Sequence, residues 1–237
     1  MINDILSRRK FLLLSLGLAG STALPLRAAN DGTAAAGYCW DSFVLRMRDL
    51  ADDYIAGLVT QDEVVQHGLE YMKALDIDSS SFADAAAAAY ESGNEYWLWQ
   101  RMLKKDNVNG GVLNIDGSKL VQLHNHPGAT GMLRIISGEA EVWQYDRVST
   151  SSDGSTAELK RVSHRNLKPG DTAFVSPDKG NIHALRSITA QCRMLDFFIP
   201  PYEQSLRTWF EPVDKNWQAL EQIKCRCISQ YELARSN

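Results

Sequence analysis

Apolar residues recur at helical spacing through the first part of the chain that follows residue 40. Two series recur at near-helical spacing: Val44, Leu45, Leu50, Ile55 and Leu58, then Val64, Val65, Leu69, Met72 and Leu75. Thr60, with acidic residues in the next turn, is typical of a helix start, and Ser81 precedes an alanine run that favours a third helix. The pattern continues to about Arg101. It predicts a helical layer over residues 41–106.

The pattern changes at Asn107, where short apolar or alternating runs begin. Gly, Asp, Ser and Pro separate these runs, which lie at 120–123, 132–136, 140–145, 172–175 and 194–199. Several short strands at close spacing predict a β-sandwich or barrel, here a mainly β domain over residues 107–237. Near the end, 216–223 favours a helix and 225–231 a closing strand.

The first residues have the features of an export signal. Ser7-Arg8-Arg9-Lys10-Phe11-Leu12 precedes a short leucine-rich stretch, and Ala28-Ala29 offers a peptidase site. The arginine pair resembles a bacterial twin-arginine signal. We therefore expect residues 1–28 to direct export, residues 29–40 to form a flexible N-terminus, and the mature protein to be periplasmic or otherwise exported.

Charge and length exclude some classes of function. The 237 residues include 25 Lys and Arg against 29 Asp and Glu, a net charge of -4. This balance disfavours binding of nucleic acid through a basic domain. No apolar run reaches the roughly 18 residues that a membrane span requires, so we expect no stable membrane insertion after processing. We also expect a monomer.

The four cysteines, Cys39, Cys192, Cys225 and Cys227, are even in number. In an oxidising compartment an even count permits up to two disulfides, with three possible connectivities. The C-x-C spacing of the last two is weak evidence for a metal site. We favour structural thiols or one disulfide, and the pairing stays open.

Three histidines are candidates for a metal site. His124 and His126 are spaced as H-x-H, and on a strand such residues point to the same face. His183 follows Pro177-Asp178-Lys179-Gly180 near the start of another predicted strand. Two ligands from one strand and a third from another would form a three-nitrogen site inside a barrel. Taken alone, the H-x-H is equally consistent with two ordinary polar residues.

The residues around these histidines resemble the two motifs of cupins, which are double-stranded β-helix, or jelly-roll, barrels. His126 is followed at the expected interval by Gly138, and Gly170, Pro177 and Gly180 precede His183 as in the second motif. The usual glutamate ligand is replaced by Gly131. Three neutral imidazoles do not offset the charge of a divalent ion, and they leave room for an anionic ligand. A substrate thiolate is such a ligand.

Three segments resemble the cysteamine dioxygenase and plant cysteine oxidase family: 124–138, 177–183 and 195–202. The resemblance implies a cupin that holds one Fe(II) per chain on His124, His126 and His183. It implies an enzyme that inserts both atoms of O₂ into a thiol sulfur to give a sulfinate. The implied partners are O₂ and a small thiol, such as cysteamine or a cysteine-like compound, or a peptide with an N-terminal cysteine.

The resemblance also implies roles for two further residues. Asp196 matches a family aspartate that orients a ligand or the substrate amine, and Tyr202 matches a tyrosine near the iron. The segment 206–210 departs from the family, which typically has Gly-Arg-x-Cys-Thr-Tyr-Tyr where this chain has Leu-Arg-Thr-Trp-Phe. Two alternatives stay open: a cupin dioxygenase for a non-thiol substrate, and a cupin that binds a metal or small ligand without catalysis.

Overall fold

A computed structural model describes residues 37–91, 95–96, 98–105, 107–117, 119–199, 207–229 and 232. Residues from Ala36 onward form one compact unit. The predicted export signal, the rest of the chain before residue 37, and Tyr202 lie outside the described residues. Within the described ranges, no helix is long and apolar enough to cross a bilayer.

Three helices form the predicted layer: α2 (Trp40–Ile55), α3 (Gln61–Ala74) and α4 (Ser80–Glu91). Thr60 begins α3 with a capping box, in which its side chain accepts from the Glu63 amide while the Glu63 carboxylate accepts from the Thr60 amide. Ser79, rather than Ser81, accepts from the amide of Phe82 at the start of α4. Ser81 instead accepts from the first amide of α2 (3.0 Å), which ties the two helices together.

Twelve strands are described, and they form two sheets. One sheet has the order β1-β2-β3-β10-β5-β8, and the other closes in the order β11-β12-β7-β6-β9-β4. Their bounds are β1 Glu95–Tyr96, β2 Trp99–Lys105, β3 Val108–Asp116, β4 Leu120–His124, β5 Thr130–Ser137, β6 Ala140–Thr150, β7 Thr156–Leu167, β8 Thr172–Val175, β9 Ile182–Ser187, β10 Gln191–Ile199, β11 Trp209–Pro212 and β12 Gln222–Ile228. The prediction of a mainly β cupin barrel preceded by helices is confirmed.

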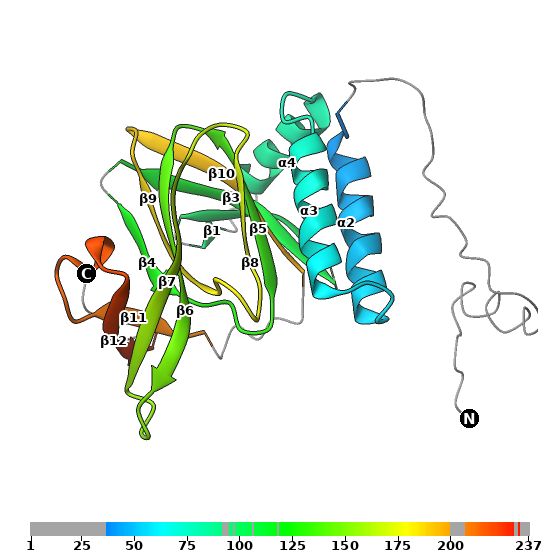
Figure 1. The fold of residues 1–237 in the computed structure, drawn as a ribbon. Helices are drawn as coiled ribbons and strands as arrows, with labels where there is room; N and C mark the ends of the chain where they lie inside the picture. Colours follow the sequence, from blue (N-terminus) through cyan, green and yellow to red (C-terminus); the bar gives the residue numbers. More distant parts are fainter. Residues whose placement is uncertain are drawn as a thin grey trace, which may run out of the picture. The chain divides into compact units, whose positions relative to one another are not determined.

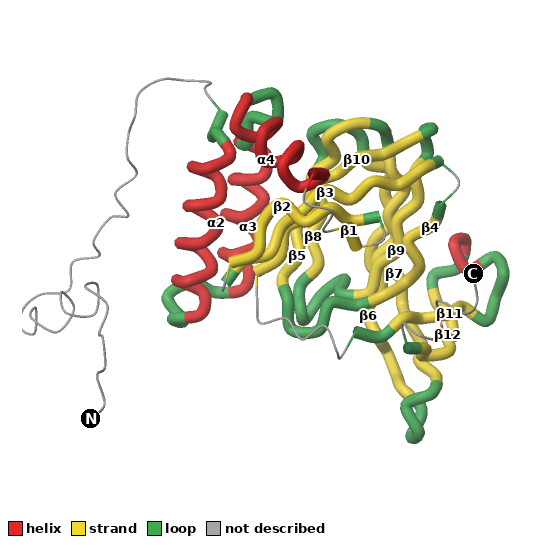
Figure 2. Tube along the Cα trace, turned by 180° about the vertical axis from the view of Figure 1, so that it is seen from behind, coloured by secondary structure: helices red, strands yellow, loops and turns green. Residues whose placement is uncertain are grey.

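The helices cover the outer face of the first sheet, as Figure 1 shows for α2 and α3 and Figure 2 shows from behind. Strand β10 joins the two layers because successive side chains point to opposite faces. Its residues Leu195, Phe197 and Ile199 pack with the helices, and the ring of Phe197 lies 5.3 Å from that of Phe43. Met194, Asp196 and Phe198 face the interior of the barrel. One strand therefore fixes the helical layer and lines the site.

The prediction of helix as far as Arg101, within a helical layer over residues 41–106, is wrong in its last part. The last helix of the layer ends at Glu91, and residues 99–105 form β2, which pairs with β3 along most of its length. Aromatic residues such as Trp99 fit a half-buried sheet surface as well as a helix face. The pairing partner, Val108–Asp116, decides between them, and it lies later in the chain.

The C-terminal prediction is also corrected in part. Residues 216–223 contain a single 3-10 turn, Trp217–Ala219, in place of a helix, and β12 begins at Gln222 rather than at Cys225. All four cysteines fall within the described ranges, and none of them forms a disulfide there. Burial raises the pKa of Cys192 to about 11 and that of Cys225 to about 12, so both are unreactive thiols that fill the core.

Arg134 on β5 connects the sheet to the end of α3. Its Nη1 donates to the backbone carbonyls of Met72 (2.8 Å) and Leu75 (2.6 Å), which have no partner within the helix. The positive charge also lies at the negative end of the helix dipole. This contact fixes the height of α3 above the sheet.

We expect Arg134→Met to lower the free energy of unfolding by about 2 kcal/mol, because two carbonyls lose a charged donor. The measurement is urea unfolding followed by circular dichroism. Arg226→Met is the matched control, since its ion pair with Glu211 is exposed on both sides and contributes below about 1 kcal/mol. Equal losses in the two variants would contradict the role given to Arg134.

Candidate metal centre

Three histidines meet at one end of the barrel interior. His124 ends β4, His126 follows two residues later, and His183 lies near the start of β9. Strands β4 and β9 pair so that His124 stands directly opposite His183. Their exposed fractions are 5% for His124, 3% for His126 and 8% for His183. The pairing register therefore brings together residues that lie 59 positions apart in the sequence.

The spacing of the ring nitrogens fits a single metal ion. One nitrogen from each of the three imidazoles lies within 4.8 Å of the others, and the Nε2 atoms of His124 and His126 are 3.1 Å apart. Two nitrogens that each bind one ion at about 2.1 Å and at a right angle are about 3.0 Å apart. The Nδ1 of His183 is buried without a hydrogen-bond partner among the described residues. The three side chains thus suit a divalent transition metal.

The surroundings keep the three imidazoles neutral. Burial holds the pKa of His124 and His126 well below the usual value and lowers that of His183 to about 3. The positive charge of Arg207 lowers all three further. A neutral imidazole is the form that binds metals, so no proton has to leave before an ion binds near pH 7.

Backbone and amide contacts orient the ligands. The Nδ1 of His124 lies 2.8 Å from the carbonyl of Gln122, which sets Nδ1 as the protonated nitrogen and leaves Nε2 for the metal. Asn181 holds the backbone of His126 on both sides, accepting from its amide (2.9 Å) and donating to its carbonyl (3.2 Å). These contacts connect the H-x-H segment to the loop that precedes His183.

Asn125, the residue between the two histidines, performs a separate task. Its Oδ1 accepts from the amide of Thr208 (2.7 Å), and its own amide donates to the carbonyl of Thr208 (3.2 Å). The start of β11 is thereby held against the metal centre. As a result the ring of Trp209 lies 4.7 Å from that of His124, and the guanidinium of Arg207 lies 3.2 Å from Nδ1 of His126.

The place of the usual carboxylate ligand is filled by an aromatic ring. Gly131 pairs with Phe198, and a Cβ at Gly131 would lie 2.7 Å from the Phe198 ring and 2.8 Å from Val175. The Phe198 ring lies 4.5 Å from that of His126. A glutamate at this position would therefore clash with the wall. The side chains around Gly131 fill the space that a carboxylate ligand would need, so the absence of the carboxylate depends on the packing as well as on Gly131 itself.

The histidines line a cavity of about 230 Å³ inside the barrel. Most of its wall is apolar, and its charged groups include Asp196 on β10 and Arg207. Gln144 on β6 stands beside His183 in the adjacent strand and donates to the carbonyl of Phe174. The cavity thus has the three histidines at one end, a carboxyl group along one wall and cationic groups beside it.

The comparisons with known proteins agree with this site. The sequence profile of the PCO_ADO family matches residues 63–213, more than half of the chain. The chain belongs to the PCO_ADO family. The matched range contains β1 to β11, all three histidines, α4 and most of α3.

Relatives of this PCO_ADO protein match over shorter stretches. Plant cysteine oxidase 1 of Arabidopsis thaliana is 33% identical over 101 residues, which are 41% of this chain and 34% of the relative. The 2-aminoethanethiol dioxygenase of Mus musculus is 19% identical over 125 residues, 44% of this chain and 49% of the relative. The matches thus cover less than half the length of either relative.

Solved structures are also similar to this chain. One of them is a conserved protein with a double-stranded β-helix domain from Klebsiella pneumoniae, with a TM-score of 0.35 and 19% identity. The similarity covers 45% of this chain and 79% of that one.

The structure of this PCO_ADO protein brings four of the five predicted site residues together. His124, His126, His183 and Asp196 line one cavity, while Tyr202 lies outside the described residues. Sequence reasoning did not select Gln144, Phe198 or the pair Arg207 and Trp209 as wall residues. The departure of 206–210 from the family pattern was a signal for the last two. No motif marked the others, since only strand register places them there.

We expect His183→Ala to weaken divalent metal binding by at least about 100-fold, since loss of a supporting contact alone costs 10–100-fold. Equilibrium dialysis with Co(II) measures this, with one ion expected per wild-type chain. His164→Ala is the control, because that imidazole stacks on Trp143 (5.3 Å) on the far side of β6. Unchanged Co(II) affinity in His183→Ala would exclude this three-histidine site.

The stability of the metal-free protein should depend on Asp196. Burial raises the pKa of this carboxyl to about 7, although the charge of Arg207 opposes the shift. An unfolded aspartate has a pKa of about 3.9. Between these values the folded state keeps a proton that the unfolded chain has lost, so the free energy of unfolding falls as the pH rises through this window.

We therefore expect the stability of the wild type, relative to Asp196→Asn, to fall by about 1 kcal/mol or more from pH 5 to pH 8. Urea unfolding with EDTA at both values measures it. Asp153→Asn is the control, because hydrogen bonds from Ser151 and Ser155 lower the pKa of Asp153 to about 2, below the tested range. A constant difference for Asp196→Asn would show that this carboxyl titrates normally.

Proposed function

We propose that this protein is an Fe(II)-dependent thiol dioxygenase that converts a thiol and O₂ into a sulfinate. Both oxygen atoms enter the product, RSH + O₂ giving RSO₂H, so no separate reductant is required. The observation that carries the proposal is a metal centre of three neutral, buried imidazoles with Phe198 packed where a carboxylate ligand would lie. Family membership supports the same reaction class.

The histidines fit iron, because imidazole suits Fe(II) as well as other divalent first-row metals. When bound there, Fe(II) supplies open coordination positions for a thiolate and O₂ and the redox chemistry that joins them. His124, His126 and His183 hold the ion without adding negative charge. A thiolate therefore brings the first anion to the centre, which favours a deprotonated sulfur ligand.

The remaining wall positions the substrate and limits water. Asp196 is a candidate acceptor for the substrate amine, and its carboxyl is partly shielded by Met194 and Phe198 on the same strand face. Tyr202 is proposed, from the family match, to place its hydroxyl near the substrate. Trp209 and Phe198 flank the histidine rings at 4.7 Å and 4.5 Å and keep this end of the cavity apolar. Such a wall strengthens the polar contacts that the substrate makes.

The test is O₂ uptake by the Fe(II)-loaded protein without residues 1–28. We expect uptake only with thiol present, matched by a product 32 mass units heavier, among cysteamine, cysteine, 3-mercaptopropionate and a peptide with N-terminal cysteine. His183→Ala should abolish uptake, and His164→Ala should leave it within about twofold, as expected for a surface substitution.

Two other outcomes lead to the alternative functions. Iron bound at one ion per chain with no uptake on any thiol would contradict the proposal and favour a metal- or ligand-binding role. Thiol-independent uptake with another substrate would indicate a non-thiol dioxygenase. The proposed export of the chain predicts, in addition, that its thiol lies outside the cytoplasm.

A further inference from the structure

A second group of polar side chains lines the cavity on strands β2 and β3, apart from the histidines. Trp99 and Arg101 come from β2 and Asn109 from β3. Trp99 Nε1, Arg101 Nε and Asn109 Oδ1 are all buried, and none has a hydrogen-bond partner among the described residues. Buried polar atoms are usually paired in folded proteins, and these three share one wall of the cavity, where a ligand can reach them.

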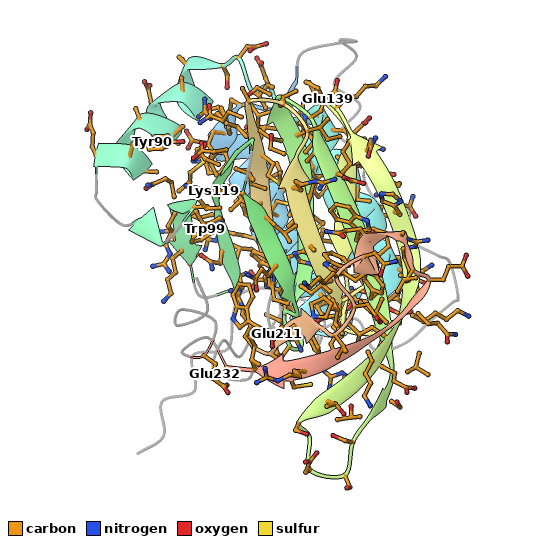
Figure 3. The ribbon with its side chains drawn as sticks, turned by 90° about the vertical axis from the view of Figure 1, so that its left-hand side faces the viewer. Tyr90, Trp99, Lys119, Glu139, Glu211 and Glu232 are labelled. Atoms are coloured by element: carbon orange, nitrogen blue, oxygen red, sulfur yellow. The ribbon has the colours of Figure 1, made fainter. Side chains whose placement is uncertain are left out.

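A glycine allows these side chains to gather. A Cβ at Gly111 would lie 2.5 Å from Cε2 of Trp99, so the indole occupies the space above that glycine. Gly111 pairs with Arg101 on one side and with Asp196 on the other. The Arg101 guanidinium carbon lies 5.6 Å from the centre of the Trp99 ring. Figure 3 shows Trp99 on β2, below Tyr90 of α4.

Arg101 and Asp196 stand in one row of the sheet but are separated by a strand, which places their Cα atoms roughly 10 Å apart. The charge of Arg207, and not that of Arg101, acts on the pKa of Asp196. Arg101 also makes no ion pair with any described carboxylate, since the ion pairs found there involve other residues. Its positive charge is therefore available to a ligand.

The donors define the ligand chemistry. Trp99 Nε1 and Arg101 Nε are N–H donors, and the guanidinium adds a full positive charge. A carboxylate accepts from both donors and neutralises the charge, which makes the hydrogen bonds charge-assisted. Asn109 Oδ1 would accept an N–H from the same molecule. A small aminothiol without a carboxylate, such as cysteamine, has no group for this wall.

We propose that Trp99 and Arg101 bind the carboxylate of the thiol substrate, so that the enzyme selects thiols that carry an acid group over simple aminothiols. This inference rests on the proposed dioxygenase function and adds the substrate class. The distance along the row favours a short cysteinyl peptide with a free C-terminus. Two residues span about 7 Å, which reaches from an amine at Asp196 to a carboxylate near Arg101.

The experiment compares matched acids and amides: cysteinylglycine with its C-terminal amide, and cysteine with cysteine amide. Within a pair the thiol and the amine are the same, so a difference in kcat/KM measures the effect of the carboxylate on binding and turnover. We expect the wild type to prefer the cysteinylglycine acid by at least tenfold. Arg101→Met should abolish that preference by raising the KM for the acid.

Two further variants make the test specific. Trp99→Phe keeps an aromatic ring above Gly111 but removes the Nε1 donor, and it should reduce the preference several-fold. Arg193→Met is the matched control, because the Nε of Arg193 is also buried without a partner while its guanidinium contacts Tyr90 outside the cavity. Arg193→Met should keep the full preference.

Binding to the metal-free protein separates this inference from the proposed function. Serylglycine has a hydroxyl in place of the thiol, and calorimetry should show it binding at least tenfold more tightly than its amide. Loss of this difference in Arg101→Met supports the carboxylate site even if no thiol is oxidised. The inference would be overturned if serylglycine and its amide bound equally and if the acid and the amide of each thiol pair were turned over equally. The dioxygenase proposal would still stand.

Discussion

The arrangement of the centre depends on burying three imidazoles without an anionic residue among them. Desolvation disfavours a protonated imidazole, and Arg207 adds to this effect. The rings are therefore neutral, and each must be held by contacts that a neutral ring allows. The Gln122 carbonyl and the tilted ring of Trp209 contact the His124 ring, the tilted ring of Phe198 contacts the His126 ring, and Asn181 holds the backbone of His126.

The need to hold the neutral histidine rings in place also links segments that are far apart in the sequence. Strand β10 carries Phe198 to His126 on its inner face and Phe197 to Phe43 of α2 on its outer face. The helical layer thus supports the strand that replaces the missing carboxylate with an aromatic ring. Asn125 works in the same way at the opposite side of the site, because its contacts with Thr208 hold Arg207 and Trp209 beside the histidines.

Charge is unevenly distributed around the cavity. Asp196 carries a carboxyl whose pKa burial raises to about 7, and arginines line other parts of the wall. A metal ion adds to the positive side of this balance. The cavity is consequently suited to a ligand that brings negative charge to the histidine end and, on our inference, a second negative group to the β2 wall.

The three histidines of the candidate metal centre and the class of barrel were predictable from the sequence. The H-x-H spacing, the glycines before His183 and the short apolar runs after Asn107 are local features, and each follows from the period of a strand or the geometry of a turn. Helices α2 and α3 were also predictable, since their apolar positions recur with the helical period. The end of the helical layer was not, because β2 becomes a strand only through its pairing with β3.

The other residues of the cavity wall are placed there by long-range strand pairing. Gln144, Phe198, Arg101 and Trp99 have no motif, and they line the site because antiparallel pairing places them beside His183, Gly131, Gly111 and Leu113. Register is a long-range property: a shift of one residue would turn each of these side chains to the opposite face. A local pattern can show that a strand exists, but the packing of the whole barrel determines what that strand faces.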